Sequence, residues 1–235
     1  VYKRQDNDIN KWLTTGLRAS VARTKQTNSV DGSGAIYNAL NQLPEVPARN
    51  PDGSFGMQTE NMYGTYFSNP LSDLIQNENY SRSTQVYVNA FADIKLWKGL
   101  VFRTEYAANY NYNTGYRFTP SYDYEFFKQQ SSASRSAGNG SNWTLKTYLT
   151  YNGTFGKHNV SVMAGHEAQE NNWESLDGSR TNFLFNSVHE LNAGDATTAK
   201  ANSSRGSSAI ESYFGRLNYN FADRYLLTAT LRADG

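Results

Sequence analysis

Apolar and polar side chains alternate along seven runs of this sequence. Successive side chains of a β-strand point to opposite faces, so such alternation indicates a strand with one apolar face and one polar face. In the run 84–96, for example, Val86 and Ile94 share one parity and Asp93 has the other. The alternation predicts seven strands, at residues 11–22, 84–96, 100–112, 143–154, 159–168, 213–221 and 225–232.

The connections between these runs alternate in length. Three of them are tight turns, at residues 97–99, 155–158 and 222–224. The segments that separate the tight turns are long, at residues 23–83, 113–142 and 169–209. If neighbouring strands are antiparallel, all tight turns lie on one rim and all long loops on the other, which is typical of outer-membrane barrels.

The long segments contain few signals of regular structure. We expect a short helix at 35–43, because a proline follows it, and a turn at 50–53, because the sequence there is Asn-Pro-Asp-Gly. The stretch 131–142 is rich in Ser, Gly and Asn, and this composition predicts a flexible segment.

Charge and hydropathy narrow the class of protein. The formal net charge is only +1 and no cluster of Lys and Arg stands out, which argues against a nucleic-acid partner. No apolar stretch approaches the roughly 18 residues of a membrane helix, whereas barrel strands are too short and too alternating to register in average hydropathy. Charged residues in the middle of the runs keep to the polar parity, and aromatic residues gather at the strand ends. The predicted fold class is all-β: an antiparallel up-and-down transmembrane β-barrel segment of about seven strands.

The alternative fold is a soluble β-sandwich, as in a carbohydrate-binding or adhesin module. Its strands would also alternate, but ordinary strands average about 5–6 residues, whereas a tilted membrane strand needs about 9–11. Several of the runs span ten residues or more. The two folds differ in the surroundings of Val86, Val88, Ala90 and Ile94, which would be uncovered in a barrel wall and packed against a second sheet in a sandwich.

Aromatic side chains in the long segments are the candidate substrate-binding residues, because a sugar or peptide can stack on such rings beside polar groups. They are Tyr63, Tyr66, Phe67, Tyr116, Phe118, Tyr122, Tyr124, Phe126, Phe127 and Trp173. Packing of the loops against one another would explain each of them equally well. The charged residues that would face the lumen of a barrel are Arg18, Arg103, Glu105, Lys146, Arg216 and Arg232. These can contact a plug or a polar solute, or form structural ion pairs between strands.

Catalytic and metal-binding patterns are absent from the sequence. His158, His166 and His189 have no spacing that builds a metal site or a Ser-His-Asp arrangement, and there is no cysteine. We therefore expect no metal, no cofactor and no enzymatic activity. An outer-membrane enzyme remains a third hypothesis, which no acid-base pair or nucleophile supports.

The last predicted hairpin carries a specific motif. Residues 217–235, LNYNFADRYLLTATLRADG, closely resemble the R-x-N-Y-x-Y-x-D-[RK]-Y-L-L-x-x-x-x-R-x-D-G-S-S-x-F segment of SusC/RagA-type TonB-linked outer-membrane transporters. Weaker similarities to that family are NPDGSF at 50–55, the FGKH turn at 155–158 and MAGHE at 163–167. These matches follow the family's order along the chain from Trp12 onward.

The resemblance implies a larger assembly than these residues encode. It implies an active importer of oligosaccharides or peptides in the bacterial outer membrane, with a plug domain inside a barrel of roughly 22 strands. The implied partners are the TonB energy-coupling complex, a SusD-like surface lipoprotein, a glycan or peptide substrate and outer-membrane lipid. On this basis we expect residues 1–10 to be a boundary segment and residues 11–235 to be a partial TonB-dependent-receptor β-barrel domain without the plug.

Overall fold

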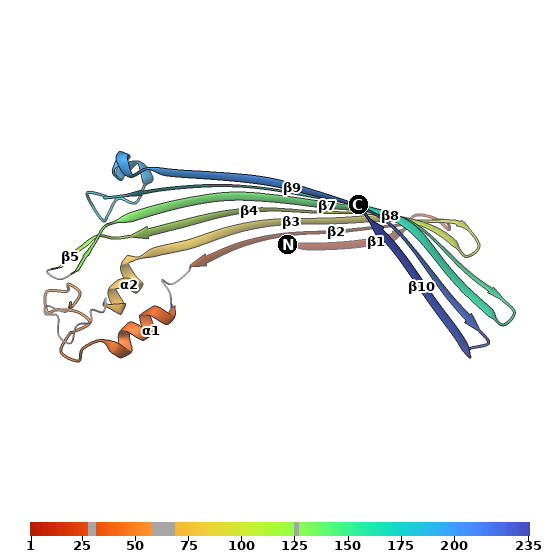
Figure 1. Ribbon diagram of the computed structural model, residues 1–235, viewed down its shortest axis with the longest axis horizontal. Coiled ribbons are helices and arrows are strands. Elements are labelled where there is room, and N and C mark those ends of the chain that lie inside the picture. The colour runs from red at the N-terminus through yellow and green to blue at the C-terminus, as the bar shows by residue number, and fades with distance from the viewer. Residues whose placement is uncertain (28–31, 58–68, 125–126) are drawn as a thin grey trace.

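An eight-stranded antiparallel sheet forms most of the molecule (Figure 1). The computed structural model describes residues 1–27, 32–57, 69–124 and 127–235. The strands of this sheet, in spatial order, are β1 (Tyr2–Asp8), β2 (Leu13–Thr27), β3 (Glu78–Trp97), β4 (Leu100–Thr119), β7 (Ser132–Phe155), β8 (His158–Thr181), β9 (Lys200–Phe221) and β10 (Tyr225–Asp234). Their spatial order follows the sequence order, so the sheet is an up-and-down meander, as the sequence predicted.

Tight turns close one end of the sheet, which is the right-hand end in Figure 1. Gly99 has a φ of +80° and Gly156 a φ of +60°, which glycine adopts without steric cost in a two-residue turn. The third turn has no glycine, and Ala222 and Asp223 adopt φ angles of +51° and +54°. Asn220 stabilises this turn, because its Nδ2 donates to Asp223 Oδ1 at 2.7 Å and its Oδ1 accepts from the Asp223 amide at 3.0 Å.

The strands extend much farther from the turns than the sequence predicted. β7 and β8 contain 24 residues each and β9 contains 22, so the segments 113–142 and 169–209 are mostly strand. The prediction of a flexible stretch at 131–142 is wrong. Gly, Ser and Asn have low intrinsic strand preference, but β4 and β8 offer backbone partners on both sides of this stretch and override that preference.

The sheet has one strand more than the seven predicted, because β1 forms within the expected boundary segment 1–10. β1 pairs with β2 from Tyr2 opposite Ser20 to Asp8 opposite Thr14. Its sequence, YKRQDND, has no apolar alternation and all its residues are exposed. Strand pairing through the backbone requires no such alternation, so sequence periodicity could not reveal β1.

The long-loop end of the sheet carries the remaining elements (Figure 1). They are α1 (Gly32–Asn41), α2 (Pro70–Gln76), the hairpin of β5 (Tyr122–Tyr124) and β6 (Phe127–Gln129), and the short helices η2 (Leu191–Ala193) and η3 (Ala196–Thr198). α1 corresponds to the helix predicted at 35–43. The turn predicted at 50–53 is present, with the Gly53 amide donating to the Asn50 carbonyl at 2.9 Å. None of the helices in the described ranges has the length and apolar character needed to cross a membrane.

The buried core lies at the same end of the sheet. It consists of Tyr116, Phe118, Ala133 and Phe183, with Phe118 only 1% exposed. The Phe183 amide donates to the Ser131 hydroxyl at 2.8 Å, which holds the segment after β8 against β4 and β7. Elsewhere the sheet is a single layer, so most of its side chains are at least partly exposed on one face or the other.

Candidate functional site

One face of the sheet is apolar from β2 to β10. Strand pairing aligns the apolar positions, with Ala108 opposite Trp143 and Leu100 opposite Tyr151. The apolar parity extends over eleven residues in β4, from Leu100 to Tyr110, and over nine in β7, from Trp143 to Tyr151. A tilted membrane strand needs about this length. We call the residues of this parity the apolar band, within residues 13–21, 86–96, 100–110, 143–151, 160–168, 213–221 and 225–233.

No described part of the chain packs a second sheet against the apolar band, as a β-sandwich would require. Leu149 is 42% exposed and Val162 is 40% exposed. Burial of apolar surface stabilises a protein by roughly 25 cal/mol per Å², so a face of this size needs an apolar environment. β1 does not share in the band, because Lys3 and Gln5 occupy the same parity there.

The opposite, polar face carries ion pairs at the level of the apolar band. On β3 and β4, Arg103 Nη1 lies 3.2 Å from Asp93 Oδ2, and Arg103 Nε lies 3.6 Å from Glu105 Oε2. Glu105 also accepts a hydrogen bond of 2.7 Å from Asn89 Nδ2. The guanidinium of Arg103 also lies 4.2 Å from the centre of the Phe91 ring. Carboxylates and an aromatic ring therefore both hold the Arg103 side chain in place.

The ion pairs continue across β7, β8 and β10. Lys146 Nζ lies 3.1 Å from Glu167 Oε2, and Arg232 Nη2 lies 3.5 Å from Glu167 Oε1. Arg232 Nε also lies 2.7 Å from Asp234 Oδ1. The side chain of Glu167 is only 14% exposed, so a largely buried carboxylate joins two cations. We call the charged band Asp93, Arg103, Glu105, Lys146, Glu167, Arg232 and Asp234.

Four of the six residues predicted to face a lumen belong to the charged band. The two others are Arg18 and Arg216. Arg18 is half-buried, and its Nε has no hydrogen-bond partner among the described groups. Arg216 Nε donates to Asn218 Oδ1 at 3.3 Å and joins no ion pair within the described ranges.

Next to the charged band on the long-loop side, uncharged residues of the polar face surround a large ring, that of Trp173. Trp173 of β8 lies between Gly140 of β7 and Gly206 of β9, and Asn111 of β4 lies beyond Gly140 in the same row. The indole is 47% exposed. We call the Trp173 surface the polar-face residues Asn111, Asn113, Gly138, Gly140, Asn142, Asn171, Trp173, Ser175, Ser204, Gly206 and Ser208.

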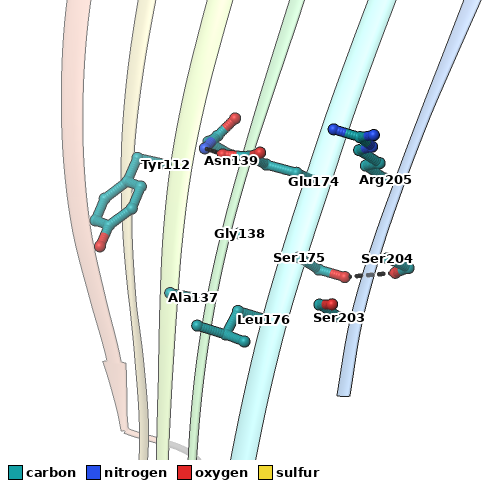
Figure 2. A pocket seen from close by; sticks show the side chains of 10 residues that line it. All are labelled: Tyr112, Ala137, Gly138, Asn139, Glu174, Ser175, Leu176, Ser203, Ser204 and Arg205. Carbon is teal, nitrogen blue, oxygen red and sulfur yellow. Dashed lines mark hydrogen bonds between the residues drawn. The ribbon is translucent and has the colours of Figure 1, made fainter. Parts of the chain in front are cut away.

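Gly206 leaves room for the indole of Trp173, and Gly140 leaves room for the side chain of Asn111. A Cβ atom at Gly206 would lie 2.8 Å from Cε2 of Trp173, so the ring rests on the bare backbone of β9. A Cβ atom at Gly140 would lie 3.0 Å from the side-chain amide of Asn111. Beside the ring, the hydroxyls of Ser175 and Ser204 are 2.8 Å apart (Figure 2). A flat aromatic ring is thus surrounded by small hydrogen-bonding side chains. The ring can stack against a ligand while the neighbouring amides and hydroxyls bind the ligand's polar groups.

The other predicted aromatic residues have different settings. Tyr116 is 5% exposed and Phe118 is 1% exposed, so they belong to the buried core rather than to a binding surface. Tyr122 lies half-buried, and its hydroxyl accepts a 3.3 Å hydrogen bond from Ser72 of α2. Tyr124 and Phe127 lie opposite each other in the β5–β6 hairpin. Outside the described residues lie Tyr63, Tyr66, Phe67 and Phe126.

Sequence analysis therefore located Trp173 but placed it in a loop, and it missed the residues around it. Asn111, Gly140 and Gly206 come from three different strands, and only the strand register brings them into one row with Trp173. The Gly, Ser and Asn content of 131–142 was the available signal. It indicates close approach and hydrogen bonding on a strand as readily as flexibility in a loop.

A groove of about 720 Å³ crosses β4, β7, β8 and β9 near the Trp173 surface (Figure 2). Most of its lining residues have the parity of the apolar band, namely Tyr112, Ala137, Asn139, Glu174, Leu176, Ser203 and Arg205. The groove thus lies mainly on the opposite face from Trp173. Asn139 Nδ2 donates to Glu174 within it.

The histidines join local contacts rather than a catalytic cluster. His166 Nε2 lies 2.8 Å from Glu211 Oε1, and the His189 ring stacks on Phe118 at 3.9 Å between centroids. His158 Nδ1 lies 2.7 Å from the Tyr219 hydroxyl. Within the described ranges, no three His, Asp or Glu side chains gather into a group that could hold a metal ion.

Comparison with known proteins shows which proteins this chain is similar to. No family model matches the sequence. The chain is 28% identical over 239 residues to TonB-dependent receptor P3 of Formosa agariphila, covering 98% of this chain and 24% of that protein. It is 26% identical to TonB-dependent receptor P26 of the same organism, covering 95% of this chain and 23% of that protein. The chain thus spans about a quarter of the length of these curated relatives.

The fold is also shared with a solved transporter. A structure of the RagAB peptide transporter matches 99% of this chain and 28% of its own, with a TM-score of 0.76 at 20% sequence identity. The match agrees with the predicted SusC/RagA type and with a barrel wall rather than a sandwich. Because the relatives are receptors, the prediction that the chain is not an enzyme is confirmed. The long alternating sheet, the sequence relatives and the shared fold together show that this chain is similar to part of the β-barrel of TonB-dependent receptors, which are outer-membrane proteins.

Proposed function

We propose that this chain forms part of the wall and the external vestibule of an active importer for uncharged oligosaccharides or peptides. The single observation that carries the proposal is the exposed indole of Trp173 within a continuous surface of Gly, Ser and Asn side chains. The surface lies beyond the apolar band, on the long-loop side. A substrate coming from outside would therefore meet it before entering the barrel.

The polar face is the one that would line the lumen. The charged band carries seven ionised side chains, and an Arg or Lys that faces lipid at the middle of the bilayer would cost about 2–4 kcal/mol. The apolar face has no charged residue between Trp143 and Tyr151. If the apolar face contacts lipid, strand alternation turns the charged band and Trp173 toward the inside of the barrel.

The Trp173 surface fits a neutral ligand better than an anionic one. All eleven of its residues are uncharged, and the next residue of β8 on this face is the acidic Asp177, so the surface offers no cation to a carboxylate or a phosphate. Asn and Ser side chains both donate and accept hydrogen bonds, which matches the hydroxyls of a sugar and the backbone amides of a peptide. The similar RagAB structure is described as a peptide transporter, which supports the peptide reading.

The proposed partners follow from the family. A TonB energy-coupling complex would act on the plug of the full-length receptor, and a SusD-like surface lipoprotein would deliver the substrate from outside. Support for them comes from the two relatives named as TonB-dependent receptors and from the shared fold of RagAB. The long strands would raise the vestibule well above the membrane, where a lipoprotein can reach it.

The proposal is tested with the full-length receptor carrying Trp173→Ala. An aromatic stacking contact contributes about 0.5–1.5 kcal/mol, so the variant should bind its oligosaccharide or peptide roughly twofold to tenfold more weakly in calorimetry. Trp97→Ala is the matched control, because Trp97 is 80% exposed but lies beside a tight turn. Equal binding by the wild type and Trp173→Ala, for every neutral oligomer that the receptor binds, would reject the proposed role of Trp173.

A further inference from the structure

Three cations gather on the apolar side of the sheet, immediately beyond the apolar band. Val21 of β2 lies opposite Val86 of β3 in the last apolar row. The next row on the same face contains Arg23, and the row after that contains Lys25 opposite Arg82. We call Arg23, Lys25 and Arg82 the basic patch. All three side chains are exposed.

The basic patch has an unbalanced positive charge. Lys25 and Arg82 are directly opposite each other in the strand register, and like charges in this position destabilise a sheet. None of the three cations forms an ion pair with any residue that the structure describes. Arg135, which lies farther along the same face, is neutralised by Glu190 at 3.0 Å. The repulsion within the patch would be relieved by a bound anion.

An aromatic ring holds two of the cations together. The Lys25 ammonium lies 5.1 Å from the centre of the Tyr80 ring, and the Arg82 guanidinium lies 5.2 Å from the same centre. Tyr80 in turn packs against buried Tyr116, with 4.8 Å between ring centroids. Two positive charges therefore lie against one aromatic ring, which is itself supported by packing.

The height of the basic patch matches that of lipid headgroups. A strand rises about 3.3 Å per residue, so Arg23 and Lys25 lie roughly 7 and 13 Å along the strand from Val21, and strand tilt reduces both values. The polar headgroup region occupies about 5–8 Å on each side of the hydrocarbon core. Lys and Arg side chains several ångströms long can bring their charges into that region.

The charge at this height differs among the strands. The row of Arg23 runs through Thr84, Tyr112 and Asn139, and in β8 and β9 it contains Glu174 opposite Arg205. An anionic headgroup would thus meet uncompensated positive charge at β2 and β3, whereas an acidic and a basic residue lie opposite each other in β8 and β9.

We propose that the basic patch binds the phosphate groups of a phosphorylated glycolipid in the outer leaflet of the membrane. Phosphate is recognised by clustered Arg and Lys side chains through charge-assisted hydrogen bonds. The acyl chains of the same lipid would cover Val21, Val86 and Tyr110, which lie next to the patch in the apolar band. The proposal rests on the position of the barrel in the outer membrane, and it does not depend on the proposed substrate.

The test uses the full-length receptor in nanodiscs of neutral phosphatidylcholine with added bisphosphorylated lipid A. The variant is Arg23→Gln/Lys25→Gln/Arg82→Gln, and bound lipid A is counted by native mass spectrometry. Cations beside an anionic membrane surface act roughly additively, so the variant should retain lipid A at least about tenfold more weakly than the wild type. Neutral glycolipid without phosphate should not distinguish the two proteins.

A matched control removes three exposed cations from the opposite end of the same sheet, namely Lys98, Lys157 and Arg224 in the tight turns. The control Lys98→Gln/Lys157→Gln/Arg224→Gln should retain lipid A like the wild type, and both variants should keep wild-type circular dichroism. Equal retention by the patch variant and the wild type, or equal loss in the control, would overturn the proposal. Displacement of the lipid by millimolar inorganic phosphate would assign the patch to free anions instead.

Discussion

The indole of Trp173 rests on the backbone of Gly206, where a Cβ atom would lie only 2.8 Å from Cε2 of the ring. This contact joins β8 to β9 at the centre of the Trp173 surface. Real Cβ atoms essentially never lie so close to a neighbour, so Gly206→Ala must move the ring. We predict that Gly206→Ala shifts the tryptophan emission of the receptor and weakens binding of a neutral oligomer severalfold.

Gly215→Ala is the control for this prediction. A Cβ atom at Gly215 would lie 3.6 Å from the Met163 carbonyl oxygen, which is an ordinary contact. This variant should leave both emission and binding unchanged. If Gly206→Ala behaved like Gly215→Ala in both measurements, the proposed role of the open backbone beside Trp173 would be wrong.

Glu167 is the residue on which one half of the charged band depends. Its largely buried carboxylate lies 3.1 Å from Lys146 and 3.5 Å from Arg232. Glu167→Gln keeps the shape but leaves Lys146 without its countercharge, and the loss of one partner of a partly buried ion pair is destabilising. We predict a decrease of about 1–2 kcal/mol in the free energy of unfolding, measured with urea on the receptor in detergent.

Glu190→Gln provides the comparison, because the side chain of Glu190 is 72% exposed in its pair with Arg135. An exposed ion pair contributes less than about 1 kcal/mol, so this variant should unfold at nearly the same urea concentration as the wild type. Equal effects of the two substitutions would mean that burial of Glu167 contributes nothing to its importance.

The hydrogen bonds of Asp195 predict that the stability of the segment between β8 and β9 depends on pH. The side chain accepts hydrogen bonds from the Thr197 hydroxyl at 2.7 Å and from the Thr197 amide at 2.8 Å. These bonds hold the pKa of Asp195 below its ordinary value of 3.8. Because the folded pKa is lowered, the stabilisation is present above pH 3.8 and disappears as the pH falls through the folded pKa.

Hydrogen exchange of residues 182–199 measures this response. The wild type should exchange faster as the pH falls below about 4, after correction for the intrinsic pH dependence of exchange. Asp195→Asn can still cap η3 but cannot titrate, so its corrected rate should change less over that range. Identical corrected profiles for the two proteins would contradict the assignment to Asp195.

The exposed edges and the apolar band predict the behaviour of residues 1–235 as an isolated polypeptide. β1 and β10 are the edge strands of the sheet and each has one side unpaired. Unpaired edges and an uncovered apolar face both promote association between chains. We expect aggregates in plain buffer by light scattering, and a folded monodisperse monomer under those conditions would contradict this expectation.

The sequence contained enough information for the membrane-spanning part of the sheet. Alternation located all seven strands that share the apolar band, because burial of one face imposes a period of two on the side chains. The two-residue turn after Phe155 also determines the register of β7 and β8, which places Lys146 opposite Glu167. The polar parity of the charged band could therefore be predicted from the sequence.

The halves of the strands that lie toward the long loops could not be predicted in the same way. Before Trp143 both faces of β7 consist mainly of Ser, Gly, Ala and Asn, so no periodicity distinguishes strand from loop there. The register across the long connections is not determined by turn geometry, and the row that unites Asn111, Gly140 and Trp173 could not be assembled from the sequence. Tyr116 and Phe118 were misassigned as binding residues because their burial depends on Phe183, a distant residue in the chain.

The central claim is that the apolar band faces lipid while the charged band and Trp173 face the interior of a barrel. It is tested most directly by spin labels on single cysteines at Thr147, Tyr148, Leu149, Thr150 and Tyr151 of the full-length receptor in bilayers. Labels at 147, 149 and 151 should be relaxed mainly by oxygen, which partitions into lipid, and labels at 148 and 150 mainly by a water-soluble nickel complex. The same relaxation at all five positions, or the reverse alternation, would contradict the account.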